Sequence, residues 1–191
     1  MKIKKLLFAS ALLFSAYNAS AQTQVIAHRG FWKTEGSAQN SIAALLKADS
    51  IGCYGSEFDV WLAADDQLVV NHDPTFKGKR MENSPSTALT AIKLDNGESL
   101  PTLAKYLKAA QPLHTRLILE LKAHSTPLRE TKAIEKIVAL VKDMGLEERM
   151  EYITFSLHAT KEFIRLAPEG TPVYYLDGNL SPKELKELGC A

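Results

Sequence analysis

Short apolar runs alternate with amphipathic stretches along this chain from about residue 25 onward. A short apolar run bounded by turn residues is typical of a strand, and apolar residues at every third or fourth position indicate a helix. Repeated strand-then-helix units predict a parallel sheet with helices outside it, because parallel strands need long crossover connections. The fold class is therefore α/β. Strands are expected at residues 25–27, 56–62, 68–71, 116–121, 152–155 and 173–176, and helices at residues 40–51, 102–110, 128–144, 159–166 and 182–188.

The strands expected at residues 56–62 and 68–71 break this alternation, because only a few residues with the turn-forming Asp65-Asp66 separate them. The segment from Pro74 to about Ser99 follows and is expected to be irregular. No stretch of the chain has the composition of a linker. A content of 46% hydrophobic and 24% charged residues is ordinary for a globular domain. We therefore expect one domain over residues 22–191, in which residues 74–99 form a small insertion.

The N-terminal residues have the features of a secretory signal peptide. Three lysines precede an apolar run at residues 6–14, and Ala19-Ser20-Ala21 supplies the small residues that a signal peptidase requires. A transmembrane anchor is the alternative, but this run is too short to cross about 30 Å of hydrocarbon. We expect residues 1–21 to be removed, which predicts a secreted or periplasmic protein with no stable membrane insertion.

The charge balance bears on the kind of partner. Removing residues 1–21 takes away three lysines and no acidic residue, so the formal net charge changes from +1 to −2. Such a nearly neutral chain argues against nucleic acid as a partner, because binding the phosphate backbone requires a basic patch. A small-molecule substrate fits better. Cys53 and Cys190 are expected to be small buried side chains rather than a disulfide, and the sequence leaves the oligomeric state undecided.

Charged and titratable side chains occur where four of the expected strands end. The carboxyl ends of parallel strands carry the ligand site in α/β folds. Residues two apart on a strand share a face, so Glu57 pairs with Asp59, and Glu120 pairs with Lys122. The full set, in chain order, is His28, Arg29, Glu57, Asp59, His72, Glu120 and Lys122.

These residue types favour a metal site beside an acid–base pair. Three carboxylates from two strands form an oxygen-rich set of ligands, which suits Mg²⁺ or Ca²⁺ rather than a metal that seeks thiolates. The two histidines have no metal-ligand spacing and are better suited to carry protons. The alternative is a structural one, in which the charged side chains pair with one another and close one end of a barrel.

At this point the sequence resembles the glycerophosphodiester phosphodiesterases. The resemblance is carried by short motifs that occur in order along the mature chain. They are Ala27-His28-Arg29-Gly30, Gly55-Ser56-Glu57-Phe58-Asp59-Val60, Leu68-Val69-Val70-Asn71-His72-Asp73-Pro74, Leu100-Pro101-Thr102-Leu103 and Leu119-Glu120-Leu121-Lys122. The family fold is a (β/α)8 TIM barrel with a small insertion after the third strand, which would account for residues 74–99.

The resemblance implies a role for each member of the set. Glu57, Asp59 and Glu120 would bind Mg²⁺ or Ca²⁺, His28 and His72 would be the general acid and base, and Arg29 and Lys122 would bind the phosphate. The implied reaction is hydrolysis of a glycerophosphodiester to an alcohol and glycerol 3-phosphate, with water or the glycerol 2-hydroxyl as the nucleophile. The rival functions are a phospholipase-like phosphodiesterase of the same barrel type and a non-catalytic barrel fragment that binds phosphodiesters.

The chain departs from the family pattern in two respects. The family's Glu-Asn-Thr string reads Gln39-Asn40-Ser41 here, so a carboxylate is replaced by an amide. About six strands are expected before Ala191, whereas the family barrel has eight, which predicts a C-terminally incomplete barrel.

Several other histidine and aromatic residues lie outside the set at the strand ends. His114 and His124 are expected to be solvated loop residues rather than functional ones. Trp61 is expected to pack against the outer helices. Two aromatic residues follow the His28 loop, Phe31 and Trp32. They either stack on an alcohol headgroup or cover the pocket, or they pack in the loop, and the sequence does not choose between these roles.

Overall fold

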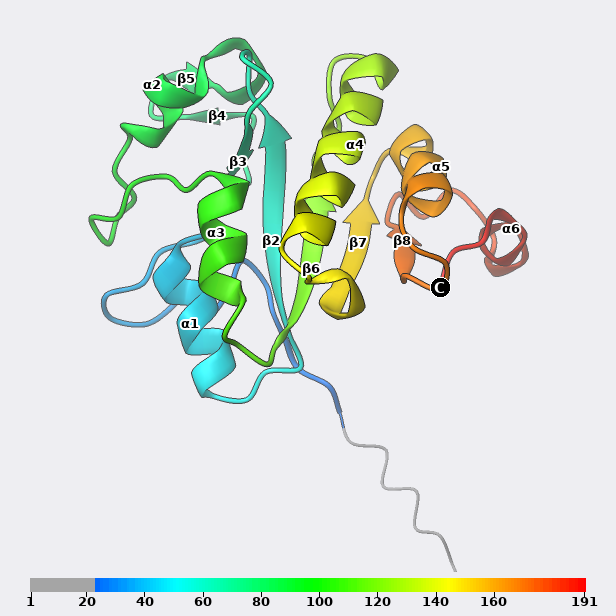
Figure 1. Cartoon of the computed structure of the whole chain (residues 1–191), viewed down its shortest axis with the longest axis horizontal. Helices are drawn as coiled ribbons and strands as arrows, with labels where there is room; N and C mark the ends of the chain where they lie inside the picture. The colour runs from blue at the N-terminus through cyan, green and yellow to red at the C-terminus, as the bar shows by residue number, and fades with distance from the viewer. Residues whose placement is uncertain (1–22) are drawn as a thin grey trace, which may run out of the picture.

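The computed structural model describes residues 23–191. The predicted signal peptide, residues 1–21, lies outside the described residues. The main sheet has six strands (Figure 1). Five of them run parallel in the order β1-β2-β6-β7-β8, and β3 pairs antiparallel with β2. The strands are β1 (Ile26–Ala27), β2 (Gly55–Leu62), β3 (Leu68–Val70), β6 (Arg116–Leu121), β7 (Met150–Thr154) and β8 (Val173–Tyr175).

The helices lie close to the expected ranges because local signals fix their starts. Hydroxyl side chains at the N-caps accept the free backbone N–H groups of the first turn, as at Ser41, Thr102 and Ser156. The α-helices are α1 (Ile42–Ser50), α2 (Ser86–Thr90), α3 (Leu103–Ala110), α4 (Pro127–Asp143), α5 (Leu157–Leu166) and α6 (Pro182–Leu188), with 3₁₀ turns at Met81–Asn83 and Glu147–Arg149.

The larger hydrophobic core lies between one face of the sheet and four helices. Phe58, Val60 and Leu62 alternate along β2 and point to this face, where they pack with side chains of α1, α3, α4 and α5. Glu57 and Asp59 alternate with these residues along β2 and therefore point to the opposite face, which we call the inner face of the sheet. The hydrophobic periodicity of β2 thus determines which face carries the carboxylates.

The predicted α/β fold is confirmed, with one difference in strand direction. β3 returns antiparallel to β2, so that Val60 pairs with Val70 and Leu62 with Leu68. The connection at residues 63–67 is a tight turn, and a parallel return would need a crossover of about a dozen residues. His72 therefore reaches the site from a hairpin rather than from the end of a parallel strand.

The insertion is more ordered than expected. It contains the hairpin strands β4 (Thr75–Phe76) and β5 (Lys79–Arg80), one 3₁₀ turn and α2. A second apolar cluster lies beneath it and includes Trp61, Met81, Leu89 and Leu94. The expectation that Trp61 packs against the outer helices is wrong, because it lies two residues beyond Asp59 and so shares the face of Glu57 and Asp59.

The main sheet is open within residues 23–191. β1 and β8 are its edges and are not joined to each other through any described strand. The exposed fractions of Val25 and Ile26, at the β1 edge, are 59% and 47%. This open parallel sheet agrees with the expectation of an incomplete barrel. In the described part of the chain, no helix combines the length and the apolar character that crossing a membrane requires.

Candidate active site

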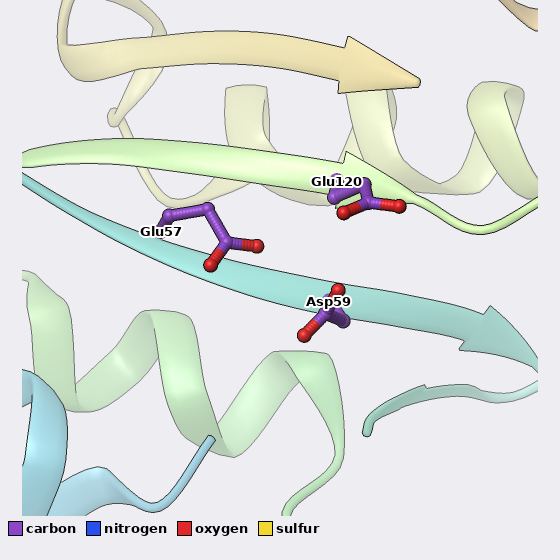
Figure 2. Close-up of side chains that lie close together, drawn as sticks. All are labelled: Glu57, Asp59 and Glu120. Atoms are coloured by element: carbon purple, nitrogen blue, oxygen red, sulfur yellow. The ribbon is translucent and has the colours of Figure 1, made fainter. Parts of the chain in front are cut away.

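Three buried carboxylates lie together on the inner face of the sheet (Figure 2). Glu57 and Asp59 come from β2 and Glu120 comes from the adjacent parallel strand β6. One oxygen of each lies within 4.8 Å of the others, and the three residues are only 4%, 0% and 6% exposed. The strand register brings them together because Asp59 and Glu120 occupy paired positions. The predicted metal-ligating residues therefore form one cluster.

This proximity makes the negative charge of the cluster unfavourable. Burial, followed by the charge of Asp59, raises the pKa of Glu57 to about 8. Burial also raises the pKa of Glu120. Asn40 offsets part of the cost at Asp59, because its side-chain amide donates to Oδ2 at 2.8 Å and accepts from the Asp59 backbone N–H at 3.1 Å.

The carboxylate oxygens fit a hard divalent cation. Oε1 of Glu57 and Oε1 of Glu120 are buried without a hydrogen-bond partner among the described residues. A buried, unsatisfied carboxylate oxygen is costly unless a cation or a donor binds it. Oε1 of Glu120 does have a charged neighbour, because Nζ of Lys122 forms an ion pair with it at 2.6 Å. An oxygen-only ligand set of this kind suits Mg²⁺ or Ca²⁺.

Two cationic side chains border the carboxylates. Lys122 Nζ also lies 3.3 Å from Oδ1 of Asp59. The backbone N–H of Arg29 donates to Oε2 of Glu57 at 2.7 Å, and its Nε lies 3.9 Å from Oδ2 of Asp59. Its guanidinium donates to Oε1 of Gln39 at 2.6 Å. The amide at position 39 thus orients Arg29 without adding negative charge.

The loop that carries His28 and Arg29 depends on a glycine. Gly30 has a φ of +75°, and a Cβ at this position would lie 2.6 Å from Cβ of Ala44 in α1. Arg29 itself has a positive φ of 60°. Only glycine allows both this backbone conformation and the close approach to α1. The first βα loop, which carries His28 and Arg29, is therefore packed directly against α1.

The two histidines have different surroundings. His28 Nε2 lies 3.9 Å from Oε2 of Glu57, and 67% of its side chain is exposed. His72 Nδ1 lies 2.7 Å from Oδ1 of Asp73, and 32% of its side chain is exposed. If Nδ1 of His72 carries the proton that Asp73 accepts, Nε2 is free to exchange a proton with a ligand.

A pocket of about 320 Å³ opens beside His72. Its walls are the first βα loop and the insertion, and Trp32 and Phe76 supply aromatic surface. Asn40, which also contacts Asp59, lines the same pocket. Trp32 therefore lines the pocket, which resolves the choice between its two expected roles.

Two histidines outside the predicted set, His114 and His124, have different surroundings. His114 is exposed, as expected. The expectation that His124 is solvated is wrong, because its Nε2 accepts the Leu62 backbone N–H at 2.9 Å and its Nδ1 contacts the Lys122 carbonyl oxygen at 2.6 Å. Both partners are backbone groups brought close by the sheet, so the spacing of residue types contained no signal for this role. Cys53 and Cys190 are free thiols in the described structure, and both are partly buried rather than fully buried as expected.

The fold and this site define an α/β protein of the barrel type with an acidic, candidate metal centre on the inner face of its sheet. No protein-family model matches the chain. A glycerophosphodiester phosphodiesterase from Parabacteroides distasonis has a solved structure that is 55% identical, with a TM-score of 0.85 over 87% of this chain and 70% of that one. The chain belongs to the glycerophosphodiester phosphodiesterase family.

Two further relatives agree with this assignment. A glycerophosphodiester phosphodiesterase from Caldanaerobacter subterraneus is 30% identical over 161 residues, which cover 77% of this chain and 64% of the relative. The structure of a phosphodiesterase from Oleispira antarctica, in complex with its product sn-glycerol 3-phosphate, is 26% identical, with a TM-score of 0.74 over 88% of this chain and 73% of that one. The chain thus spans less than two thirds of the length of the curated relative.

Proposed function

We propose that this protein hydrolyses glycerophosphodiesters to an alcohol and glycerol 3-phosphate in a reaction that depends on a divalent cation. The observation that carries the proposal is the buried group of Glu57, Asp59 and Glu120, in which Oε1 of Glu57 has no hydrogen-bond partner among the described residues and which lies beside the cationic side chains of Arg29 and Lys122. Membership of the family and the product bound to the Oleispira relative support the same substrate class.

Glu57, Asp59 and Glu120 would hold the cation, either Mg²⁺ or Ca²⁺. When bound, it would neutralise negative charge on the phosphate oxygens and on the three carboxylates. Arg29 and Lys122 then have a second function beyond pairing with the acids. Their side chains lie next to the cluster and can donate to the phosphate as its charge increases in the transition state.

His28 and His72 would act as the acid–base pair. One histidine takes a proton from the nucleophile, and the other gives a proton to the departing alkoxide. Asp73 favours a proton on Nδ1 of His72, which leaves Nε2 as the reactive atom. The nucleophile is either water or the glycerol 2-hydroxyl, and a cyclic phosphate that accumulates transiently in ³¹P NMR spectra would identify the second route.

The pocket beside His72 would hold one arm of the diester. Its mixture of aromatic and polar side chains suits a small polar alcohol. The position of the pocket next to His72 makes that histidine the proton donor or acceptor for the arm bound there. We also propose that the protein is exported, which sequencing the N-terminus of the mature chain would test by showing a start at Gln22.

One experiment tests the proposed reaction. The chain is incubated with glycerophosphocholine or glycerophosphoethanolamine, with and without a chelator, and glycerol 3-phosphate is measured. We expect release that the chelator stops and that His28→Ala or His72→Ala lowers by about 10²- to 10⁴-fold. The matched control is His114→Ala, an exposed histidine outside the site. Absence of product at every cation concentration would refute the hydrolase assignment.

A second function is favoured by the open sheet. Within residues 23–191 the sheet is open, and β1 and β8 are not joined to each other through any described strand. The chain would then bind a phosphodiester without hydrolysing it. Calorimetric titration with glycerol 3-phosphate in the presence of Mg²⁺ or Ca²⁺ separates these functions, since binding without turnover supports the second.

A further inference from the structure

Trp61 links the region of the acids to His72. It lies on the same face of β2 as Glu57 and Asp59 and is 6% exposed beneath the insertion. Its indole Nε1–H donates to the backbone carbonyl oxygen of His72 at 3.3 Å. A buried indole N–H needs such a partner, and this one fixes the backbone from which the His72 side chain projects.

His124 links the same strand to Lys122. Its Nε2 accepts the N–H of Leu62, so Nε2 carries no proton and Nδ1 must carry it. Nδ1–H therefore donates to the carbonyl oxygen of Lys122 at 2.6 Å. Both ring nitrogens are bonded to backbone groups, which leaves His124 no free nitrogen with which to act on a substrate.

The two rings contact each other. The centroids of Trp61 and His124 are 5.2 Å apart, and their planes are inclined by 55°. The backbone N–H of Lys122 donates to the Val60 carbonyl oxygen at 3.1 Å, so both backbone polar groups of Lys122 are held. The backbone from which the Lys122 side chain extends is therefore fixed, and Nζ lies next to the carboxylates of Glu120 and Asp59.

We propose that Trp61 and His124 form a positioning bridge that sets the placement of His72 and Lys122 relative to the acid cluster. The bridge consists of the indole hydrogen bond to His72, the contact between the rings, and the two hydrogen bonds of the imidazole. Neither residue would touch the substrate. The inference rests on the proposed function for its kinetic consequences, while the placement of His72 and Lys122 is measurable without turnover.

The test uses two substitutions that keep an aromatic ring. Trp61→Phe removes the indole N–H, and His124→Phe removes both imidazole hydrogen bonds. His114→Phe is the matched control, because it makes the same change at an exposed histidine. His124→Gln restores an acceptor for the Leu62 N–H and is the conservative variant.

The readouts are chosen so that loss of stability alone would not change them. The chain has five histidines, so long-range ¹H–¹⁵N NMR can follow the His72 ring. We expect Trp61→Phe to shift the His72 signals and to lower kcat about fivefold with KM unchanged. We expect His124→Phe to weaken binding of glycerol 3-phosphate about fivefold, as implied by the loss of one hydrogen bond from a displaced Lys122 to the phosphate. We expect His124→Gln to recover part of that loss.

Each outcome decides the inference. Folded Trp61→Phe and His124→Phe proteins with wild-type His72 signals and wild-type affinity for glycerol 3-phosphate would overturn it. If His124→Phe does not fold, Trp61→Phe and His124→Gln decide in the same way. If the wild-type chain shows no turnover, the proposed hydrolysis fails, but the NMR shifts and the affinities still support or overturn the bridge.

Discussion

Asp59 and Glu120 occupy paired positions on the neighbouring parallel strands β2 and β6, and both are buried on the inner face of the sheet. Two carboxylates in this relationship repel each other, and Glu57 adds a third from two residues before Asp59 on β2. The arrangement is unfavourable for folding by itself and favourable for binding a cation. Stability and metal affinity should therefore respond in opposite directions to changes in these acids.

Removing the charge of Glu57 tests this opposition. We expect Glu57→Gln to raise the Tm of the metal-free chain by about 4 °C, equivalent to roughly 1 kcal/mol, because repulsion and desolvation decrease. The same change should remove most of the Tm increase caused by Mg²⁺ or Ca²⁺. Differential scanning fluorimetry with a chelator and then with each cation measures both effects. Asp143→Asn, at the exposed end of α4, is the control and should change neither value.

The raised pKa of Glu57 predicts how stability depends on pH without metal. The pKa of Glu57 is about 8 in the folded chain, well above the 4.5 of an ordinary glutamate. The folded state therefore binds more protons between these values. The contribution of Glu57 to stability should be fully present below pH 4.5 and be lost as pH rises through 8. The slope from this group is at most about 1.4 kcal/mol per pH unit.

Urea denaturation in chelator at several pH values between 5 and 9 measures this contribution. Glu57→Gln should flatten the profile, because the substituted side chain does not titrate. A wild-type profile that rises with pH over this range, or one that Glu57→Gln leaves unchanged, would contradict the prediction.

Asp73 is expected to orient His72 through the 2.7 Å contact with Nδ1. Asp73→Asn keeps the size of the side chain but removes its charge. We expect kcat to fall about tenfold with little change in metal affinity, as is typical when the partner of a reactive histidine is lost. Asp177→Asn, which alters an exposed carboxylate near the C-terminus, should leave kcat unchanged. Equal rates for the two variants would exclude an orienting role.

Trp32 is expected to contribute to binding of the diester. We expect Trp32→Ala to raise KM about fivefold with kcat within about twofold of wild type, because loss of an aromatic contact costs roughly 1 kcal/mol. Phe31→Ala is a suitable control, since Phe31 is the adjacent exposed aromatic residue and does not line the pocket. Steady-state kinetics of both variants test the assignment.

Gly30 and Gly52 offer a matched comparison. Both have positive φ, at +75° and +72°, but a Cβ at Gly52 meets nothing within 4 Å, whereas one at Gly30 meets Ala44 at 2.6 Å. We expect Gly52→Ala to cost about 1 kcal/mol in unfolding free energy, from backbone strain alone. Gly30→Ala should cost about 2–4 kcal/mol because overpacking is added. Urea denaturation of both variants gives the difference, and equal costs would show that α1 moves aside.

The sequence predicted most of the elements, since their signals are local. The expected strand at residues 116–121 and the expected helix at residues 182–188 coincide with β6 and α6. The short turn between β2 and β3 was also visible in the sequence, and the antiparallel pairing of these strands agrees with it, because such a turn is too short for a parallel crossover. The order within residues 74–99 was missed, since its short hairpin and helix are stabilised by packing on Trp61.

The same division applies to the site. The sequence by itself determined that Glu57 and Asp59 share a face, because strand side chains alternate with a period of two residues. The sequence also placed Glu120 in the same set of carboxylates. Only the tertiary structure decided that Asp59 and Glu120 are paired in register and that Trp61 lies on the face of the acids, and only it gave His124 its backbone partners. The Leu62 N–H that His124 accepts is 62 positions away, and the separation is too large for any local pattern to record. The residue types and the alternation of side chains along a strand can be read from the sequence because they are local. Hydrogen-bond partners on different strands come together only once the sheet has formed.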